Sequence, residues 1–144
     1  GLPAFLAFNA GVDSGLMIAQ YTQAALVSEN KRLSVPASVD SIPSSAMQED
    51  HVSMGWSAAR KLRKVIDNLT HILGIELLTA ARAVELRKGL NPAKATQAVI
   101  TELRKVVDPI GPDRFLSPEM ERATLVIKEG RAVNAAKAIV TSLI

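Results

Sequence analysis

Apolar residues recur three and four positions apart through one long stretch of the chain, which starts near residues 49–53 and continues to Arg87. This spacing places them on one face of a helix, and Gly89 supplies a stop signal. At 1.5 Å per residue the helix is on the order of 50 Å long, whereas a lone domain of this size has a diameter of roughly 30 to 35 Å. The apolar positions are Leu62, Val65, Ile66, Leu69, Ile72, Leu73, Leu77 and Leu78.

Between Ile72 and Ala81 the apolar residues go nearly all round the expected helix. A helix that is apolar on every side has to be surrounded by other elements. The rest of the chain is too short to do this. We therefore expect other segments or other subunits to cover Ile72–Ala81. We also expect the chain to self-associate or to stay bound to the missing segments, because this surface is costly to leave in water.

Turn and capping residues set the elements of the first third of the chain. Residues 1–12 are expected to form a loop. Asp13 or Ser14 can cap a helix that runs to about Leu33. Residues 34–48 are rich in serine and contain two prolines, so we expect them to be irregular.

Two shorter helices and a tail are expected in the last third. Asn91–Pro92 is a good N-cap and first-turn pair for a helix to about Val107. After a break rich in Pro and Gly, Ser117–Glu119 starts a further helix that Gly130 can close. The tail after Arg131 forms one more helix or an extended arm. The pattern as a whole predicts an all-α fold.

Composition narrows the class of protein. The chain is 48% apolar but only 3% aromatic, and its 17 basic and 14 acidic residues leave a formal charge of +3. The charge is too small and too interspersed to indicate a nucleic-acid partner. No apolar run approaches the roughly 20 residues of a membrane span. With no cysteine there is no disulfide framework or thiolate nucleophile, and we expect an intracellular, cytoplasmic protein.

The candidate chemistry is concentrated in a polar stretch, Asp40–Gly55, directly ahead of the long helix. Glu49 can act as a base or as a charge that orients a substrate amine. Alternatively, Glu49 and Asp50 occupy a first helical turn, where negative charge complements the helix dipole. His51 has no second ligand at helical spacing, so we expect no metal site and assign it an orienting hydrogen bond.

Several segments of the chain resemble successive segments of the histidine ammonia-lyases. The resemblance is strong over residues 2–88 and weak beyond them. Its most specific string is Gln48–Ser53, because related phenylalanine and tyrosine ammonia-lyases usually carry an Asn-Gln-Asp version. The matching segments are Leu2–Leu6, Ser14–Gln20, Ala24–Lys31, Pro36–Ser41, Gln48–Met54 and Ala58–Arg60.

The resemblance implies long antiparallel helices, bundled at the core of a homotetramer whose sites are built from several subunits. It implies elimination of ammonia from L-histidine to give trans-urocanate. The family uses a 4-methylidene-imidazol-5-one group, formed from an internal Ala-Ser-Gly. Glu49 matches the catalytic glutamate, and Met17 matches a residue near the substrate pocket. Within the motif, we assign Gln48 to substrate binding and His51 to holding its neighbours in place.

The chain also departs from the family's pattern. Met47 and Asp13 stand where asparagine is common, and no Ala-Ser-Gly occurs; Asp13–Gly15 is no substitute, since it lacks the alanine. The start of the chain has no basic leader and no initiator Met. We therefore expect a C-terminal portion of a lyase, inactive alone, whose cofactor-bearing part, tyrosine base and carboxylate-binding arginine lie upstream.

Within that portion, residues 1–90 would form the long core helices and residues 91–144 the shorter peripheral ones. Two other interpretations stay open. One is a non-catalytic helical oligomerisation module, in which the polar stretch is only a cap. The other is a tyrosine or phenylalanine ammonia-lyase of the same superfamily.

Overall fold

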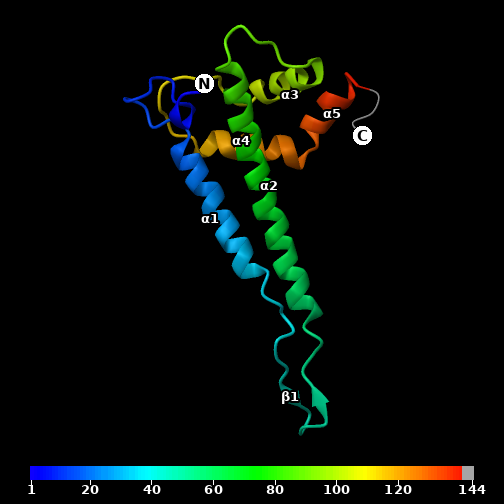
Figure 1. The fold of residues 1–144 in the computed structure, drawn as a ribbon. Helices are drawn as coiled ribbons and strands as arrows, with labels where there is room; N and C mark the ends of the chain where they lie inside the picture. Colours follow the sequence, from blue (N-terminus) through cyan, green and yellow to red (C-terminus); the bar gives the residue numbers. More distant parts are fainter. Residues whose placement is uncertain (141–144) are drawn as a thin grey trace.

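Two long antiparallel helices organise the computed structural model, which describes residues 1–140. Helix α1 (Met17–Leu33) runs in one direction and α2 (Gly55–Glu85) returns beside it (Figure 1). The 31 residues of α2 correspond to about 46 Å. The expected all-α fold with long antiparallel helices is confirmed.

Residues 34–54 connect the two helices through a hairpin that projects beyond their ends (Figure 1). Strand β1 (Pro43–Ser44) pairs antiparallel with β2 (Glu49–Asp50). The prediction that α2 starts within residues 49–53 is therefore wrong. The helix begins at Gly55 because residues 49 and 50 are paired as a strand and Met54 is left-handed, with φ of 61°.

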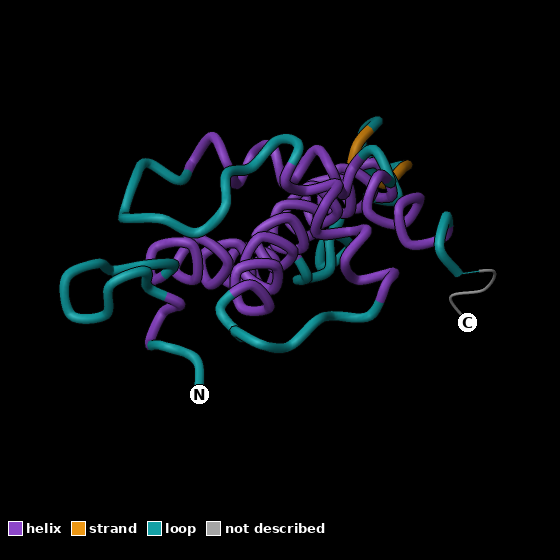
Figure 2. Tube along the Cα trace, turned by 90° about the horizontal axis from the view of Figure 1, so that it is seen from above, coloured by secondary structure: helices purple, strands orange, loops and turns teal. Residues whose placement is uncertain are grey.

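Short helices gather at the other end of α2. They are η1 (Ala4–Leu6), α3 (Lys94–Arg104), α4 (Ser117–Lys128) and α5 (Arg131–Lys137). Helix α4 crosses α2, while α3 packs against α5. Seen from above, these helices and their loops spread around the axis of the two long helices (Figure 2).

The core lies where the second half of α2 meets α4. Gly74 of α2 makes this crossing possible, because a Cβ atom there would lie 2.7 Å from the backbone N and Cα of Thr124. Residues of α1 and α3, with Leu16 just before α1 and Val107 just after α3, complete this core cluster. The fully buried or nearly buried apolar side chains are Leu16, Ala19, Ile75, Leu78, Ala81, Ile100, Leu103, Val107, Ala123 and Val126.

Contrary to the sequence expectation, the chain itself buries part of Ile72–Ala81, but Leu73 and Ala80 are exposed and Ile72 and Leu77 are only half-buried. The close crossing at Gly74 lets α4 cover Ile75, Leu78 and Ala81 from within the chain. A larger uncovered apolar surface starts earlier on α2 and reaches this stretch at Leu73. An exposed stripe runs along one helical face at four- and three-residue spacings. It consists of Leu62, Ile66, Leu69 and Leu73, which are 58%, 51%, 47% and 39% exposed.

Helix ends differ from the sequence prediction where tertiary contacts intervene. Neither Asp13 nor Ser14 caps α1, whose N-cap position is Leu16 without a side-chain hydrogen bond. Helix α3 begins at Lys94, beyond Asn91–Pro92, and ends at Arg104.

The last two helices follow the sequence signals more closely. Helix α4 begins at Ser117 with a proline in its first turn, as predicted. Gly130, left-handed with φ of 70°, separates it from α5, so the tail begins as a helix. The end of that tail, residues 141–144, lies outside the described residues.

Candidate functional site

Glu49 lies in the hairpin, at the end of the molecule farthest from α4 (Figure 1). It pairs with Ser44 across the two strands. One of its carboxylate oxygens, Oε2, accepts a hydrogen bond of 2.9 Å from the Ser45 hydroxyl. The residue is exposed and lies six positions before the first residue of α2. The alternative that Glu49 and Asp50 occupy a first helical turn is therefore wrong.

The tip of the hairpin holds three consecutive left-handed residues. Ser45, Ala46 and Met47 have φ of 50°, 55° and 66°, and the Gln48 N–H donates to the Ser45 carbonyl at 3.2 Å. Residues other than glycine adopt this conformation at a cost, and asparagine adopts it more readily than methionine. Met47 is also 85% exposed. Such backbone strain is typical of functional segments and does not stabilise the fold.

His51 is attached to the hairpin through its backbone. Its N–H donates to the Ile42 carbonyl at 2.8 Å, which extends the strand pairing by one bond. The other histidine, His71, belongs to a different part of the molecule, where its Nε2 lies 3.5 Å from a carboxylate oxygen of Glu121 and joins α2 to α4. Within residues 1–140 no group of three acidic or histidine residues could hold a metal ion.

A shallow hollow of about 550 Å³ lies at the base of the hairpin. Serine hydroxyls and two carboxyl groups line it, so it can accept hydrogen-bond donors. The lining residues are Ser38, Val39, Asp40, Ser41, Asp50, Val52, Ser53 and Met54. Glu49, Gln48 and His51 are not among them. This part of the chain therefore presents the motif to its surroundings without enclosing it.

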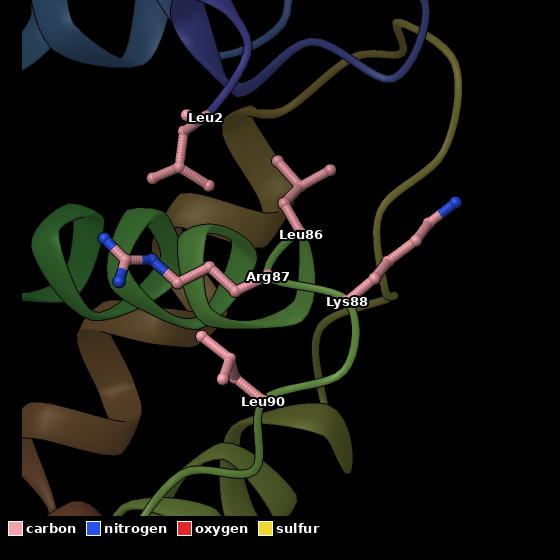
Figure 3. A pocket seen from close by; sticks show the side chains of 6 residues that line it. Leu2, Leu86, Arg87, Lys88 and Leu90 are labelled. Carbon is pink, nitrogen blue, oxygen red and sulfur yellow. The ribbon is translucent and has the colours of Figure 1, made fainter.

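Met17 lies at the opposite end of α1 from the hairpin. The 17 residues of that helix separate the two by about 25 Å, so the chain does not bring Met17 and Glu49 together. A second hollow, of about 410 Å³, occurs at the same end of the helix pair as Met17 and is lined by Gly1, Leu2, Leu86, Arg87, Lys88 and Leu90 (Figure 3). Its lining has no carboxylate and no imidazole, so it offers no acid–base pair.

Arginines organise the loop between α3 and α4, a feature that spacing in the sequence did not reveal. Arg82 is only 5% exposed. Burial, and then the nearby Arg114 charge, lower its pKa below the ordinary value of an arginine. The pKa of Arg114 is raised by its hydrogen bonds to Glu119, which lie at 2.5 and 3.0 Å. These cations contact backbone carbonyls of residues 108–111 and fix the loop.

Neither Asp113 nor Asp13 was singled out as functional from the sequence, yet the structure joins them. Asp113 accepts the backbone N–H groups of Ser14 and Gly15, at 2.6 and 2.9 Å. In turn, its own N–H donates to Asp13 at 3.1 Å. The only signal available beforehand was that Asp13 departs from the usual asparagine. A carboxylate there supplies two acceptor oxygens where an amide would supply one.

Comparison with known proteins identifies sequences that are similar to this chain. The sequence profile of the family described as aromatic amino acid lyase matches residues 1–105. A histidine ammonia-lyase of Streptomyces avermitilis is 69% identical over 140 residues, an alignment that covers 96% of this chain and 27% of that protein. The chain thus spans about a quarter of the length of such relatives.

Solved structures show the same relationship. The crystal structure of histidine ammonia-lyase from Trypanosoma cruzi matches with a TM-score of 0.90 and 44% identity, covering 96% of this chain and 27% of that one. The tyrosine aminomutase of Streptomyces globisporus matches with a TM-score of 0.87 and 36% identity, over 96% of this chain and 26% of that one. From the shared fold and the matched sequence, the chain belongs to the aromatic amino acid lyase family.

Proposed function

We propose that this chain is part of a histidine ammonia-lyase, which eliminates ammonia from L-histidine to give trans-urocanate, and that Glu49 works at its active site. The observation that carries the proposal is the placement of Gln48–His51 on an exposed hairpin with a strained tip. A segment that only capped α2 would need neither the projection nor the strain.

The geometry of Glu49 suits recognition of a cationic or N–H-bearing substrate. The Ser45 hydroxyl engages Oε2 and holds the carboxylate in one orientation. An ionised carboxylate accepts through both oxygens, so Oε1 stays available for a substrate imidazole or amine. Gln48 would bind substrate beside it. His51, fixed through its bond to Ile42, would keep the strand in register.

Assembly of several subunits would bring together site residues that lie far apart within one chain. Met17 lies at the end of α1 away from the hairpin that carries Glu49, and the exposed stripe of α2 leaves large apolar side chains in water. A homotetramer, with each site built from several subunits, would cover the stripe and place another subunit's residues against the hairpin. Each subunit would be a full-length lyase that contains this chain as its C-terminal portion, with long helices in residues 1–90 and peripheral ones in 91–144, in a cytoplasmic enzyme.

The methylidene-imidazolone group would come from another part of the lyase. Asp13–Gly15 does not fit as its source, because the tripeptide lacks the alanine and the amides of Ser14 and Gly15 both donate to Asp113. When present, the group supplies the electrophile that activates the substrate. The contribution that we assign to this chain is substrate binding and charge at Glu49, and no metal is involved in that assignment.

The test is Glu49→Gln in the full-length lyase, followed by the ultraviolet absorbance of urocanate. We expect kcat/KM for L-histidine to fall roughly a hundredfold or more, because the amide removes both the charge and one acceptor oxygen. Asp50→Asn is the matched control, since Asp50 is the adjacent exposed carboxylate of the same strand. Equal, small effects of the two changes would leave Glu49 a structural residue and favour the oligomerisation module.

Substrate choice is tested with the unchanged parent enzyme. L-Tyrosine and L-phenylalanine are supplied in parallel with L-histidine under the same conditions. Urocanate from L-histidine alone is the expected result. Product from an aromatic substrate instead would assign the protein to a tyrosine or phenylalanine ammonia-lyase.

A further inference from the structure

The start of α1 is held by a residue from the far end of the chain. The carboxylate of Asp113 spans the backbone N–H groups of Ser14 and Gly15, using Oδ2 for one and Oδ1 for the other. These partners are 99 and 98 residues apart in sequence. Asp113 also lies beyond residues 1–105, to which the family profile is matched. Both oxygens are engaged with backbone, so its carboxylate is used as a clamp.

The clamp is closed from the other side by Asp13. The Asp113 N–H donates to Asp13 Oδ1 at 3.1 Å, and Asp13 Oδ2 accepts the Asn9 N–H at 2.9 Å. Gly15 is left-handed and buried, and a Cβ atom on it would lie 2.5 Å from the Phe5 carbonyl oxygen. The Gly15 backbone therefore packs directly against Phe5 and Ala7, with no space for a side chain. Met17, the first residue of α1, follows it directly.

The loop that carries Asp113 is itself braced against α2 and α3. Arg104 makes two bonds to Glu85 of α2, at 2.7 and 2.8 Å, and a third to the Asp108 carbonyl at 3.0 Å. Arg114 donates to the Pro109 carbonyl at 3.0 Å. Charge-assisted bonds of this kind hold side chains in fixed geometry better than neutral ones. These contacts fix the position of Asp113, and Asp113 in turn fixes the turn before α1.

We propose that Asp113 is a positioning residue for the substrate site, because it fixes the turn that places Met17. The inference rests on the proposed function, which puts Met17 at the wall of the substrate pocket. Asp113 touches no substrate in this scheme and acts only through the Ser14 and Gly15 amides. Its loss should change how substrate binds, beyond any loss of stability.

The experiment uses the full-length lyase with Asp113→Asn, Met17→Ala and the double variant. An asparagine at 113 keeps one acceptor oxygen and turns an NH₂ group toward a backbone N–H, so one of the two bonds is lost. We expect kcat/KM for L-histidine to fall roughly tenfold to a hundredfold, mainly through KM. If Asp113 acts through Met17, the double variant should be no worse than Met17→Ala alone, because coupled residues are not additive.

Glu102→Gln is the control for stability alone. Glu102 binds Lys105 and Arg131 at the α3–α5 contact, away from α1. This variant should lose stability in urea and keep the parent's KM and kcat. If Asp113→Asn does not accumulate as folded enzyme, KM and kcat are measured for Asp113→Glu instead. This variant keeps both acceptor oxygens but displaces them by one methylene group.

Four results would overturn the inference. Parent-like KM and kcat in Asp113→Asn, or additive effects in the double variant, would overturn it while leaving the proposed function intact. A parent enzyme that does not convert L-histidine, or Met17→Ala with unchanged kinetics, would overturn the assigned role of Met17 and this inference with it.

Discussion

Gly74→Ala is expected to destabilise the protein although alanine is the better helix former. At an exposed position within a helix, the change from glycine to alanine stabilises by about 1 kcal/mol. At Gly74 the new Cβ would lie 2.7 Å from the N and Cα of Thr124, about 0.7 Å inside the 3.4 Å at which ordinary contact begins. The obstructing atoms are backbone of α4, which cannot rotate away.

The net effect follows from the two opposing contributions. Overpacking of a dense core costs about 1 to 3 kcal/mol, and rigid backbone on both sides favours the upper part of that range. After the gain in helix propensity is subtracted, we expect a loss of about 2 kcal/mol in the free energy of unfolding. The crossing of α2 and α4 buries Ile75, Leu78 and Val126, so a shift of α4 would also loosen their packing.

The assay is urea unfolding of the full-length protein followed by circular dichroism, with comparison of midpoints at an unchanged m-value. Gly55→Ala is the matched control, because it makes the same change in the same helix where the nearest atom, Ser53 Oγ, lies at 3.5 Å. We expect that control to be neutral or stabilising. If Gly74→Ala is as stable as Gly55→Ala, the argument that glycine is required for the α2–α4 crossing is refuted.

Three further predictions concern charge, strain and assembly. Hydrogen bonds from Lys105, and then Arg131, hold the pKa of Glu102 below its ordinary value of 4.5. The ionised side chain therefore contributes its full stability above pH 4.5, and this contribution is lost as the pH falls through the lower folded-state pKa. Glu102→Gln should reduce the difference in urea midpoint between pH 7 and pH 3. Met47→Asn should stabilise by up to about 1 kcal/mol, because asparagine adopts the left-handed φ of 66° more readily; an unchanged thermal midpoint would contradict this. Leu69→Glu, which puts a charge in the exposed stripe of α2, should weaken self-association in sedimentation velocity, and an unaltered distribution would exclude the stripe as an interface.

Local signals in the sequence predict the elements of this protein well where no distant segment competes. The helix over residues 117–128 begins at Ser117 with Pro118 in its first turn, because the preference of proline for the first turn depends only on adjacent residues. The long apolar helix follows from periodicity in the same way. Its start is misplaced because pairing of Glu49 with Ser44 is a contact between two strands, which helix propensity does not describe.

The sequence by itself determined the all-α class and the long helix that ends near Arg87, because these depend on periodicity and on adjacent residues. Its resemblance to the histidine ammonia-lyases gave the family, the antiparallel arrangement of long helices and Gln48–His51 as the candidate motif. Only the tertiary structure decided that α4 covers Ile75 and Leu78 and that Asp113 clamps the start of α1. It also decided that Met17 lies at the end of α1 away from the hairpin that carries Glu49. These features depend on which distant surfaces fit together. The close fit at Gly74 depends on the absence of a single Cβ atom, and a periodic sequence pattern does not predict it.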